Sequence, residues 1–277
     1  MSDVTEAPSA TAANQAARPL QGSNVWYELM TTDPDGAAKF YGSVVPGWTI
    51  GSPIGGGQDY RMIGRGDGGF AGGVLSLSES DCAEGARPIW LGYIGVDDVD
   101  ATVADVEKLG GKTIMAAFDI PQGRIAMVAD PQGSPFYLMK PTPPEGNPDA
   151  KSDVFSPTEE QRISWNELST SDPAAARKFY TELFDWDDTD FMDMGEMGEY
   201  RFLDHAGTRL GALCGVMPGD QSKWRYYIRV PSVSQAAEAA KSAGGSIAMG
   251  PMEVPGGDHI IIGSDPQGAE FALVGKA

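Results

Sequence analysis

The chain has 277 residues, about the length of two domains, and 41% of them are hydrophobic, which excludes a disordered chain. Its 20 lysines and arginines are outnumbered by 39 aspartates and glutamates, so the net charge is −19 and nucleic-acid phosphates would be repelled. No apolar segment approaches the ~20 residues of a membrane span, and the first residues lack the basic and apolar regions of a signal peptide. The sequence therefore predicts a cytoplasmic protein with no nucleic-acid or membrane partner.

In chain order, the Ala-, Ser- and Thr-rich residues 1–22 are predicted to be a disordered tail. Residues 25–31 are rich in β-formers and predict a strand. Asp33 followed by Pro34 is typical of a helix start, which predicts a helix over 36–44. Alternating segments, punctuated by Gly and polar residues, predict further strands at 49–53, 58–63, 72–77, 89–96, 112–118, 124–129 and 134–139, with a second helix at 99–109.

The second half of the chain repeats the first. Residues 26–41 (WYELMTTDPDGAAKFY) return at 165–180 (WNELSTSDPAAARKFY), and the Asp-Pro-Gln-Gly of 130–133 returns at 265–268. Matching segments in the same order indicate two copies of one domain. The predicted domains are 23–140 and 163–277, joined by a Pro-rich, charged linker at 141–162. In the second domain, strands are predicted at 163–170, 224–230, 259–263 and 270–274, and helices at 173–183 and 234–243.

Within each domain, the order strand–helix–strand–strand–strand occurs twice. This order resembles the vicinal-oxygen-chelate superfamily of glyoxalase I, bleomycin-resistance proteins and extradiol dioxygenases, especially its tandem two-domain, glyoxalase-like members. The resemblance is carried by W-x-E-L with D-P-x-x-A-x-K-F-Y, by the closing D-P-Q-G, and by V-D-D-V-D-A at 96–101. It implies an α+β fold of four βαβββ modules forming two tandem domains. Each domain would have a curved mixed sheet whose concave face holds a ligand, with helices on the other face.

The resemblance also indicates where a divalent metal would be held. Relatives use His, Glu or Gln on the concave face, and these are donors that suit such an ion. Carried over onto this sequence, the ligand positions fall on Trp26, Leu91 and Tyr137 in the first domain and on Trp165, Arg225 and Ala272 in the second. None of these six residues is a good metal ligand. We therefore predict no metal site and no cofactor, although the family resemblance leaves a divalent metal open.

Two glutamates lie two positions after the tryptophans that open each repeat. Because strand side chains alternate between faces, Glu28 shares the face of Trp26, and Glu167 shares that of Trp165. A carboxyl group shielded from water there would have a raised pKa and could act as a general base. The alternative, which we favour, is a structural pair with an arginine, and the candidates are Arg61 and Arg201 from a repeated Tyr-Arg pair. Glu28 and Glu167 are the candidate catalytic residues.

Aromatic residues recur on the predicted strands and suggest walls for a small, partly aromatic ligand. Ordinary core aromatics are an equally good interpretation. In the second domain, Arg225 and Arg229 hint at an anionic ligand group, which Leu91 and Gly95 at the matching places of the first domain would not bind. The predicted ligand-binding residues are Trp26, Tyr60, Arg61, Tyr93, Tyr137, Trp165, Tyr200, Arg201, Arg225 and Tyr227.

The remaining chemically active residues have simpler interpretations. His205 lies in a predicted hairpin turn and is expected to be exposed to solvent, whereas His259 is expected to be a hydrogen-bonded strand residue. The acidic residues 185–196 match a calcium loop at four positions, but Asp190 stands where that loop requires Gly, so we predict a solvated loop. Cys214 is expected to be a small buried group rather than a nucleophile.

Three functions follow from the sequence. In the first, a glyoxalase/bleomycin-resistance-like protein binds a small organic molecule, aromatic or anionic, in a concave cleft without the classical metal site. In the second, a metal-dependent lyase, isomerase or dioxygenase uses displaced ligands, recruited from Glu28, Glu167 and His259. In the third, the domains form a non-catalytic interaction module. Tandem duplication pairs two domains within one chain, so the protein is expected to be a monomer or a homodimer.

Overall fold

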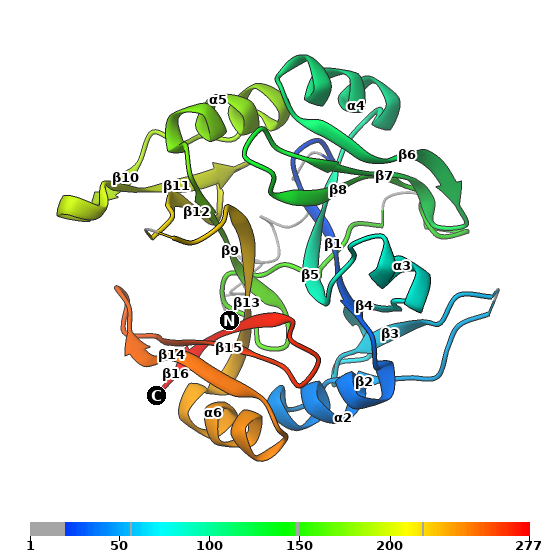
Figure 1. The fold of residues 1–277 in the computed structure, drawn as a ribbon, viewed down its shortest axis with the longest axis vertical. Helices are drawn as coiled ribbons and strands as arrows, with labels where there is room; N and C mark the ends of the chain where they lie inside the picture. The colour runs from blue at the N-terminus through cyan, green and yellow to red at the C-terminus, as the bar shows by residue number, and fades with distance from the viewer. Residues whose placement is uncertain (1–19, 56, 148–149, 218) are drawn as a thin grey trace, which may run out of the picture.

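The computed structural model describes residues 20–55, 57–147, 150–217 and 219–277, which form two curved eight-stranded sheets (Figure 1). The strands of the first sheet are β1 (Asn24–Thr31), β2 (Thr49–Ile50), β3 (Tyr60–Gly64), β4 (Phe70–Ser76), β5 (Ile89–Gly95), β6 (Lys112–Ile120), β7 (Gly123–Ala129) and β8 (Pro135–Pro141). Those of the second are β9 (Ile163–Thr170), β10 (Phe191–Asp193), β11 (Glu199–His205), β12 (Thr208–Gly215), β13 (Lys223–Ser232), β14 (Ser246–Glu253), β15 (His259–Ser264) and β16 (Glu270–Lys276). The strand orders are β2-β3-β4-β1-β5-β8-β7-β6 and β10-β11-β12-β9-β13-β16-β15-β14.

Four of the described helices belong to this repeating pattern. They are α2 (Pro34–Val44), α4 (Val99–Lys108), α5 (Pro173–Phe184) and α6 (Val233–Ser242). The predicted fold of four βαβββ modules in two tandem domains is thereby confirmed. A fifth helix, α3 (Glu79–Ala83), was not predicted. In the described part of the chain, no helix has the length and apolar character needed to span a membrane.

The first helix of each domain begins where the repeated Asp-Pro pair predicts. The Asp33 carboxylate accepts a hydrogen bond from the backbone N–H of Gly36 at 2.9 Å, and Asp172 accepts one from Ala175 at 3.0 Å. Each bond satisfies a backbone donor that has no partner within the helix, and the following proline has a backbone geometry that suits the first turn. The same short motif therefore starts both helices.

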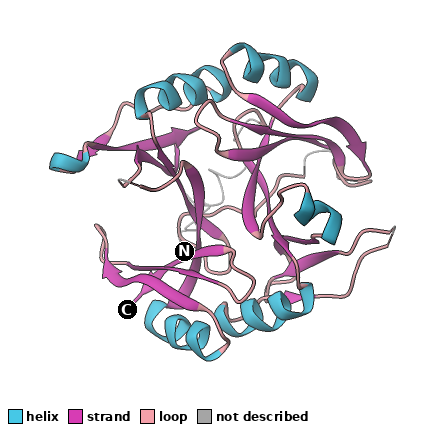
Figure 2. Cartoon of the chain, in the orientation of Figure 1, coloured by secondary structure: helices cyan, strands magenta, loops and turns pink. Residues whose placement is uncertain are grey.

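The two sheets lie back to back, with α2, α4, α5 and α6 around the outside (Figures 1 and 2). The central strands β1 and β5 approach β9 and β13, and apolar residues of both domains form one continuous core. Helix α2 packs beside α6 at one end of the molecule, and α4 packs beside α5 at the other. The concave faces of the sheets consequently point away from each other and form two separate surfaces.

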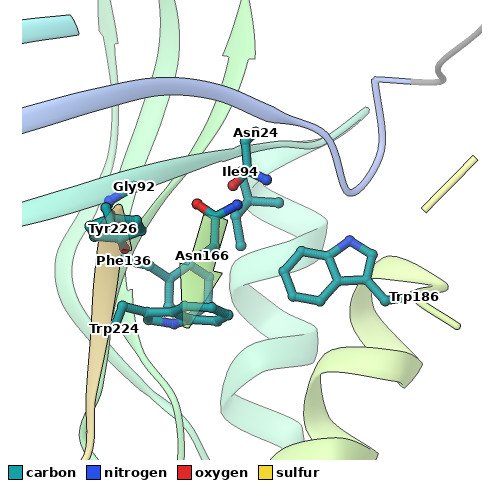
Figure 3. Close-up of a pocket in the computed structure, with 8 residues that line it drawn as sticks. All are labelled: Asn24, Gly92, Ile94, Phe136, Asn166, Trp186, Trp224 and Tyr226. Atoms are coloured by element: carbon teal, nitrogen blue, oxygen red, sulfur yellow. Dashed lines mark hydrogen bonds between the residues drawn. The ribbon is translucent and has the colours of Figure 1, made fainter. Parts of the chain in front are cut away.

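Side chains from both sheets meet in this shared core. Figure 3 shows a small space there, lined mainly by aromatic rings and two asparagines. The hydroxyl of Tyr27 donates to Oδ1 of Asn166 at 2.8 Å, and the hydroxyl of Tyr226 accepts from the backbone N–H of Gly92 at 2.8 Å. The space measures about 10 Å³, which is hardly room for one water molecule. It therefore belongs to the interface between the domains and not to a ligand site.

Described residues on either side of the first domain pack against the rest of the protein. Of the predicted tail, residues 1–19 lie outside the described residues, while Gly22 accepts a hydrogen bond from Trp186 Nε1 at 2.8 Å. Within the predicted linker, Val154 and Phe155 are buried in the shared core. The surrounding prolines and charges predicted a linker, and these two apolar side chains attach part of it to the protein.

Candidate functional site

Strand β1 presents two different faces. Leu29 points into the shared core, whereas Trp26 and Met30 pack in an apolar cluster on the concave face of the first sheet. Glu28 lies between these two along the strand, so alternation places it on the concave face as well. We call Glu28 and the residues around it site 1, namely Trp26, Tyr60, Leu91, Tyr93 and Tyr137.

Glu28 is almost completely buried, at 2% exposed, within aromatic side chains. The hydroxyl of Tyr93 donates to its Oε2 at 2.9 Å, and the ring of Tyr93 stacks on that of Tyr137 with centroids 4.2 Å apart. Trp26 Nε1 donates to the hydroxyl of Tyr60 at 2.8 Å. Oε1 of Glu28 is buried and makes no hydrogen bond of good geometry with any described residue. A buried carboxylate oxygen without a hydrogen bond lowers the stability of the folded protein, so a hydrogen-bond donor is expected to bind there.

Burial changes the acidity of this carboxyl group. It raises the pKa of Glu28 from 4.5 to about 7, because an ionised carboxylate loses its hydration in an apolar surrounding. The hydroxyls of Tyr93, Tyr60 and Tyr137 oppose the rise by hydrogen bonding to the carboxylate, but their effect is smaller. Near neutral pH, Glu28 is therefore divided between its protonated and ionised forms.

The second sheet carries a matching arrangement, which we call site 2; it comprises Trp165, Glu167, Tyr200, Arg225 and Tyr227. Trp165 Nε1 donates to the hydroxyl of Tyr200 at 2.9 Å, and that hydroxyl donates to Oε2 of Glu167 at 2.7 Å. The hydroxyl of Tyr227 lies 3.3 Å from Oε1 of Glu167. Both sites thus share a Trp–Tyr pair and a tyrosine that hydrogen-bonds the glutamate.

The sites differ on the strand next to the glutamate. In the β1–β5 pairing, Leu91 lies opposite Glu28, and in the β9–β13 pairing Arg225 lies opposite Glu167. Nη1 of Arg225 lies 2.6 Å from Oε1 of Glu167, and its Nε lies 2.9 Å from Oε1 of Glu270. Lys223 is 2.6 Å from the other oxygen of Glu270. The carboxylates of site 2 therefore have cationic partners within the protein, whereas Glu28 has none among the described residues.

The predicted arginine partners of the glutamates lie elsewhere. Arg61 pairs with Asp35 at 2.6 Å and with Asp59 at 2.8 Å, so the proposed Glu28–Arg61 pair is not formed. Arg201 likewise pairs with Glu199 at 2.7 Å instead of Glu167. The reason is strand alternation: the tyrosine before each arginine faces the glutamate, so the arginine itself faces away. The structural pairing expected for Glu167 is present, but it is made by Arg225.

Other candidates lie apart from the two sites. His205 is 6% exposed, so its expected exposure to solvent is wrong: it lies at the end of β11, next to residue 22. His259 lies on β15, three strands from β9 and Glu167, and its Nδ1 is buried without a hydrogen-bond partner among the described atoms. Burial raises the pKa of the Cys214 thiol to about 11, which opposes a nucleophilic role.

The charged residues of the second sheet are largely paired with one another. Arg229, for which the sequence suggested an anionic ligand, lies 2.8 Å from Asp258. In the acidic segment 185–196, Asp188 pairs with Arg177, and Asp190 lies 2.6 Å from Arg209. The pairing of Arg225 with Glu270 was not foreseen from the sequence. In the sequence these residues are two opposite charges far apart along the chain, and opposite charge alone does not identify them as partners.

Comparisons with known proteins agree with the fold and the repeat. Residues 26–139 match the family model described as "Glyoxalase-like domain", and residues 162–273 match that of the "Glyoxalase/Bleomycin resistance protein/Dioxygenase superfamily". The chain is 33% identical over 261 residues to "Putative glyoxylase CFP32" of Mycobacterium bovis, which covers 93% of this chain and 96% of that protein. The chain belongs to the glyoxalase/bleomycin resistance protein/dioxygenase superfamily.

Solved structures with this fold include a dioxygenase and a glyoxalase. The 2,3-dioxygenase LapB of Pseudomonas sp. KL28 aligns with a TM-score of 0.61 and 13% identity, covering 94% of each chain. The Mn(II)-bound glyoxalase of Novosphingobium aromaticivorans aligns with a TM-score of 0.61 and 18% identity, covering 92% of this chain and 83% of that one. At these identities, the likeness concerns the fold alone.

A metal such as the Mn(II) of that glyoxalase does not suit the side chains present here. The described residues contain no group of three or more His, Cys, Asp or Glu that could hold an ion. Site 1 offers a single carboxylate surrounded by phenol and indole rings, and the carboxylates of site 2 are bound to Arg225 and Lys223. A divalent ion needs several oxygen, nitrogen or thiolate donors converging on one point. The donor set therefore does not fit the family's metal centre.

Proposed function

We propose that this protein binds a small, partly aromatic organic molecule in site 1, with Glu28 as the polar anchor and without a metal ion. The observation that carries the proposal is the buried Oε1 of Glu28, which makes no hydrogen bond of good geometry in the described structure although it lies among aromatic rings. A ligand that donates a hydrogen bond there would satisfy it. The surrounding rings would bury an aromatic body, as is usual for small-molecule sites.

Site 1 suits this role better than site 2. In site 2, Glu167 already accepts from Tyr200 and Tyr227 and is paired with Arg225. A ligand entering site 2 would have to break these contacts. A ligand entering site 1 would instead supply a hydrogen bond that Oε1 of Glu28 lacks among the described residues. Trp26 and Tyr60 are partly exposed and mark the accessible side of site 1.

The experiment is a calorimetric titration of the full chain with small aromatic probes such as phenol, benzyl alcohol, benzylamine and phenylacetate. Trp26→Ala removes one wall of site 1 and is expected to weaken binding of any probe that binds; Trp165→Ala is the matched change in site 2 and leaves it unchanged. If no probe binds at millimolar concentration, or if only Trp165→Ala weakens binding, the proposal fails.

Proton transfer by Glu28 is a second candidate function. It is favoured by the pKa of about 7, since a general base works best when its pKa is near the operating pH. Glu28 would take a proton from a carbon atom of a bound ligand and return it, which exchanges hydrogen with the solvent. Incubation of a bound probe in D2O followed by NMR tests this: exchange that is lost in Glu28→Gln supports it, and exchange that persists in the variant contradicts it.

A further inference from the structure

The two sites form an internal comparison, because the same scaffold holds a glutamate in each. Strand pairing places Leu91 opposite Glu28 and Arg225 opposite Glu167. Tyr93 and Tyr227 hydrogen-bond the glutamate of their own site, and the Trp–Tyr pair is also present in both. Two differences lie next to the carboxylate. Leu91 stands in site 1 where Arg225 stands in site 2, and Tyr137 stands in site 1 where Ala272 stands in site 2, so only site 2 has a cation there.

In site 2, the guanidinium group of Arg225 provides a positively charged hydrogen-bond donor for the glutamate. It lies 2.6 Å from Oε1 of Glu167, the distance of a charge-assisted hydrogen bond. Glu28 is more deeply buried than Glu167, at 2% against 9% exposed, yet its Oε1 makes no hydrogen bond of good geometry with the described residues. The ionisable groups that face Glu28 are Tyr60 from β3, Tyr93 from β5 and Tyr137 from β8, and none of them is a cation.

We propose that site 1 binds a small organic cation, whose ammonium, amidinium or guanidinium group takes the place that the Arg225 guanidinium occupies in site 2. The inference rests on the function proposed above and names the class of ligand. The ligand supplies the charge that Leu91 cannot, and it pairs with Oε1 of Glu28. A positive charge also binds favourably to electron-rich rings, and Tyr93, Tyr137 and Trp26 provide these around the carboxylate.

The rest of site 1 fits the body of such a ligand. The apolar cluster on this face contains Leu91, Ile125 and Met139, with Met30, Met115 and Met127 at its margin. Flexible thioether side chains adapt to ligands of irregular shape. The net charge of −19 raises the local concentration of cations and repels anions. An aromatic or aliphatic amine therefore suits this site better than a carboxylate of the same size.

The test compares probes of one size and different charge. Calorimetric titration at pH 8 uses benzylamine and benzamidine as cations, benzyl alcohol as the neutral probe and phenylacetate as the anion. The cations are expected to bind at least ~10-fold more tightly than benzyl alcohol, because they pair with the ionised Glu28. Equal affinity for cation and alcohol overturns the inference of a cation site, but it leaves the proposed binding function standing. If no probe binds, both the inferred cation site and the proposed binding function are overturned.

Two variants locate the effect at Glu28. Glu28→Gln keeps the shape of the side chain and removes its charge, so the preference for the cations over benzyl alcohol disappears. Glu238→Gln, on an exposed part of α6, changes the net charge equally and keeps the preference. Leu91→Arg supplies an internal guanidinium group and is expected to weaken benzamidine binding at least ~10-fold, whereas Leu91→Met retains it. A preference that survives Glu28→Gln overturns the proposal, even if Leu91→Arg fails to fold.

Discussion

The hydroxyl of Tyr41 in the first domain donates a hydrogen bond to Oδ2 of Asp265 in the second, at 3.0 Å. The exchange is reciprocal, since the hydroxyl of Tyr180 in the second domain donates to Oδ2 of Asp130 in the first, at 3.1 Å. These residues come from the two motifs that repeat along the chain, K-F-Y and D-P-Q-G. Each motif thus finds its partner in the other copy, and the duplication produces one interlocked molecule.

Each of these tyrosines lies at the centre of a buried polar chain. The hydroxyl of Tyr41 also accepts a hydrogen bond from Trp90 Nε1 at 2.9 Å, and the hydroxyl of Tyr180 accepts one from Trp224 Nε1 at 2.9 Å. Removal of either hydroxyl therefore leaves an indole N–H and a carboxylate oxygen without this partner. Such groups retain the full cost of desolvation, which makes the contact more important than one hydrogen bond suggests.

The first prediction concerns this link between the domains. Tyr41→Phe removes only the hydroxyl and is expected to lower the free energy of unfolding by ~1–3 kcal/mol, measured by urea denaturation. Tyr180→Phe should have an effect of similar size, because its contacts are the same. A decrease below ~0.5 kcal/mol in both variants, the range of ordinary surface substitutions, would show that the pairs do not hold the domains together.

The second prediction concerns the pH dependence of stability at Glu28. Because the folded protein holds a proton there up to a pKa of about 7, and the unfolded chain releases it near 4.5, unfolding becomes easier as pH rises through this range. The difference amounts to ~3 kcal/mol. Glu28→Gln should therefore gain stability relative to the original protein between pH 5 and pH 8, measured as the difference between two urea curves at each pH.

Glu167→Gln provides the contrast for that experiment. Glu167 is paired with Arg225. Replacing the Glu167 carboxylate with the glutamine amide leaves Arg225 without one of its two carboxylate partners. The variant is expected to be less stable than the original protein at pH 8, opposite in sign to Glu28→Gln. The same sign for both variants would mean that the two glutamates have equivalent surroundings.

The third prediction concerns Arg225 itself. Arg225→Ala separates Glu167 and Glu270 from their shared cation and is expected to lower the free energy of unfolding by ~3 kcal/mol. Methylguanidinium at millimolar concentration should partly restore the melting temperature, since it fits the space and charge of the missing group. N-methylurea, which is neutral and similar in shape, should not. Equal rescue by both compounds would argue against a charge requirement.

The fourth prediction concerns metal content. Protein expressed in medium supplemented with manganese, iron and zinc should contain far less than one equivalent of each, because the donors described in sites 1 and 2 do not converge on an ion. Treatment with EDTA should leave the melting temperature unchanged. One equivalent of a metal that disappears in Glu28→Ala or Glu167→Ala would instead show that these glutamates hold an ion.

Much of the fold could be predicted from the sequence because its signals are local. The Asp-Pro helix starts, the alternation along the strands and the repeat at 26–41 and 165–180 each depend on neighbouring residues only. The same alternation correctly separates Leu29, in the core, from Trp26 on the concave face. The short helix α3 was missed because five residues are too few to produce a periodic pattern.

Tertiary structure decided which of these side chains meet. The sequence contains Glu28, Leu91 and Arg225, but only the register between adjacent strands places Leu91 opposite one glutamate and arginine opposite the other. Likewise, the burial of His205 and the pairing of Tyr41 with Asp265 come from segments far apart in the chain. The sequence by itself determined the modules and the faces of their strands, because these follow from local geometry. The contacts that make the two sites different required the folded chain, because hydrogen bonds and charge pairing act between groups that only folding brings together.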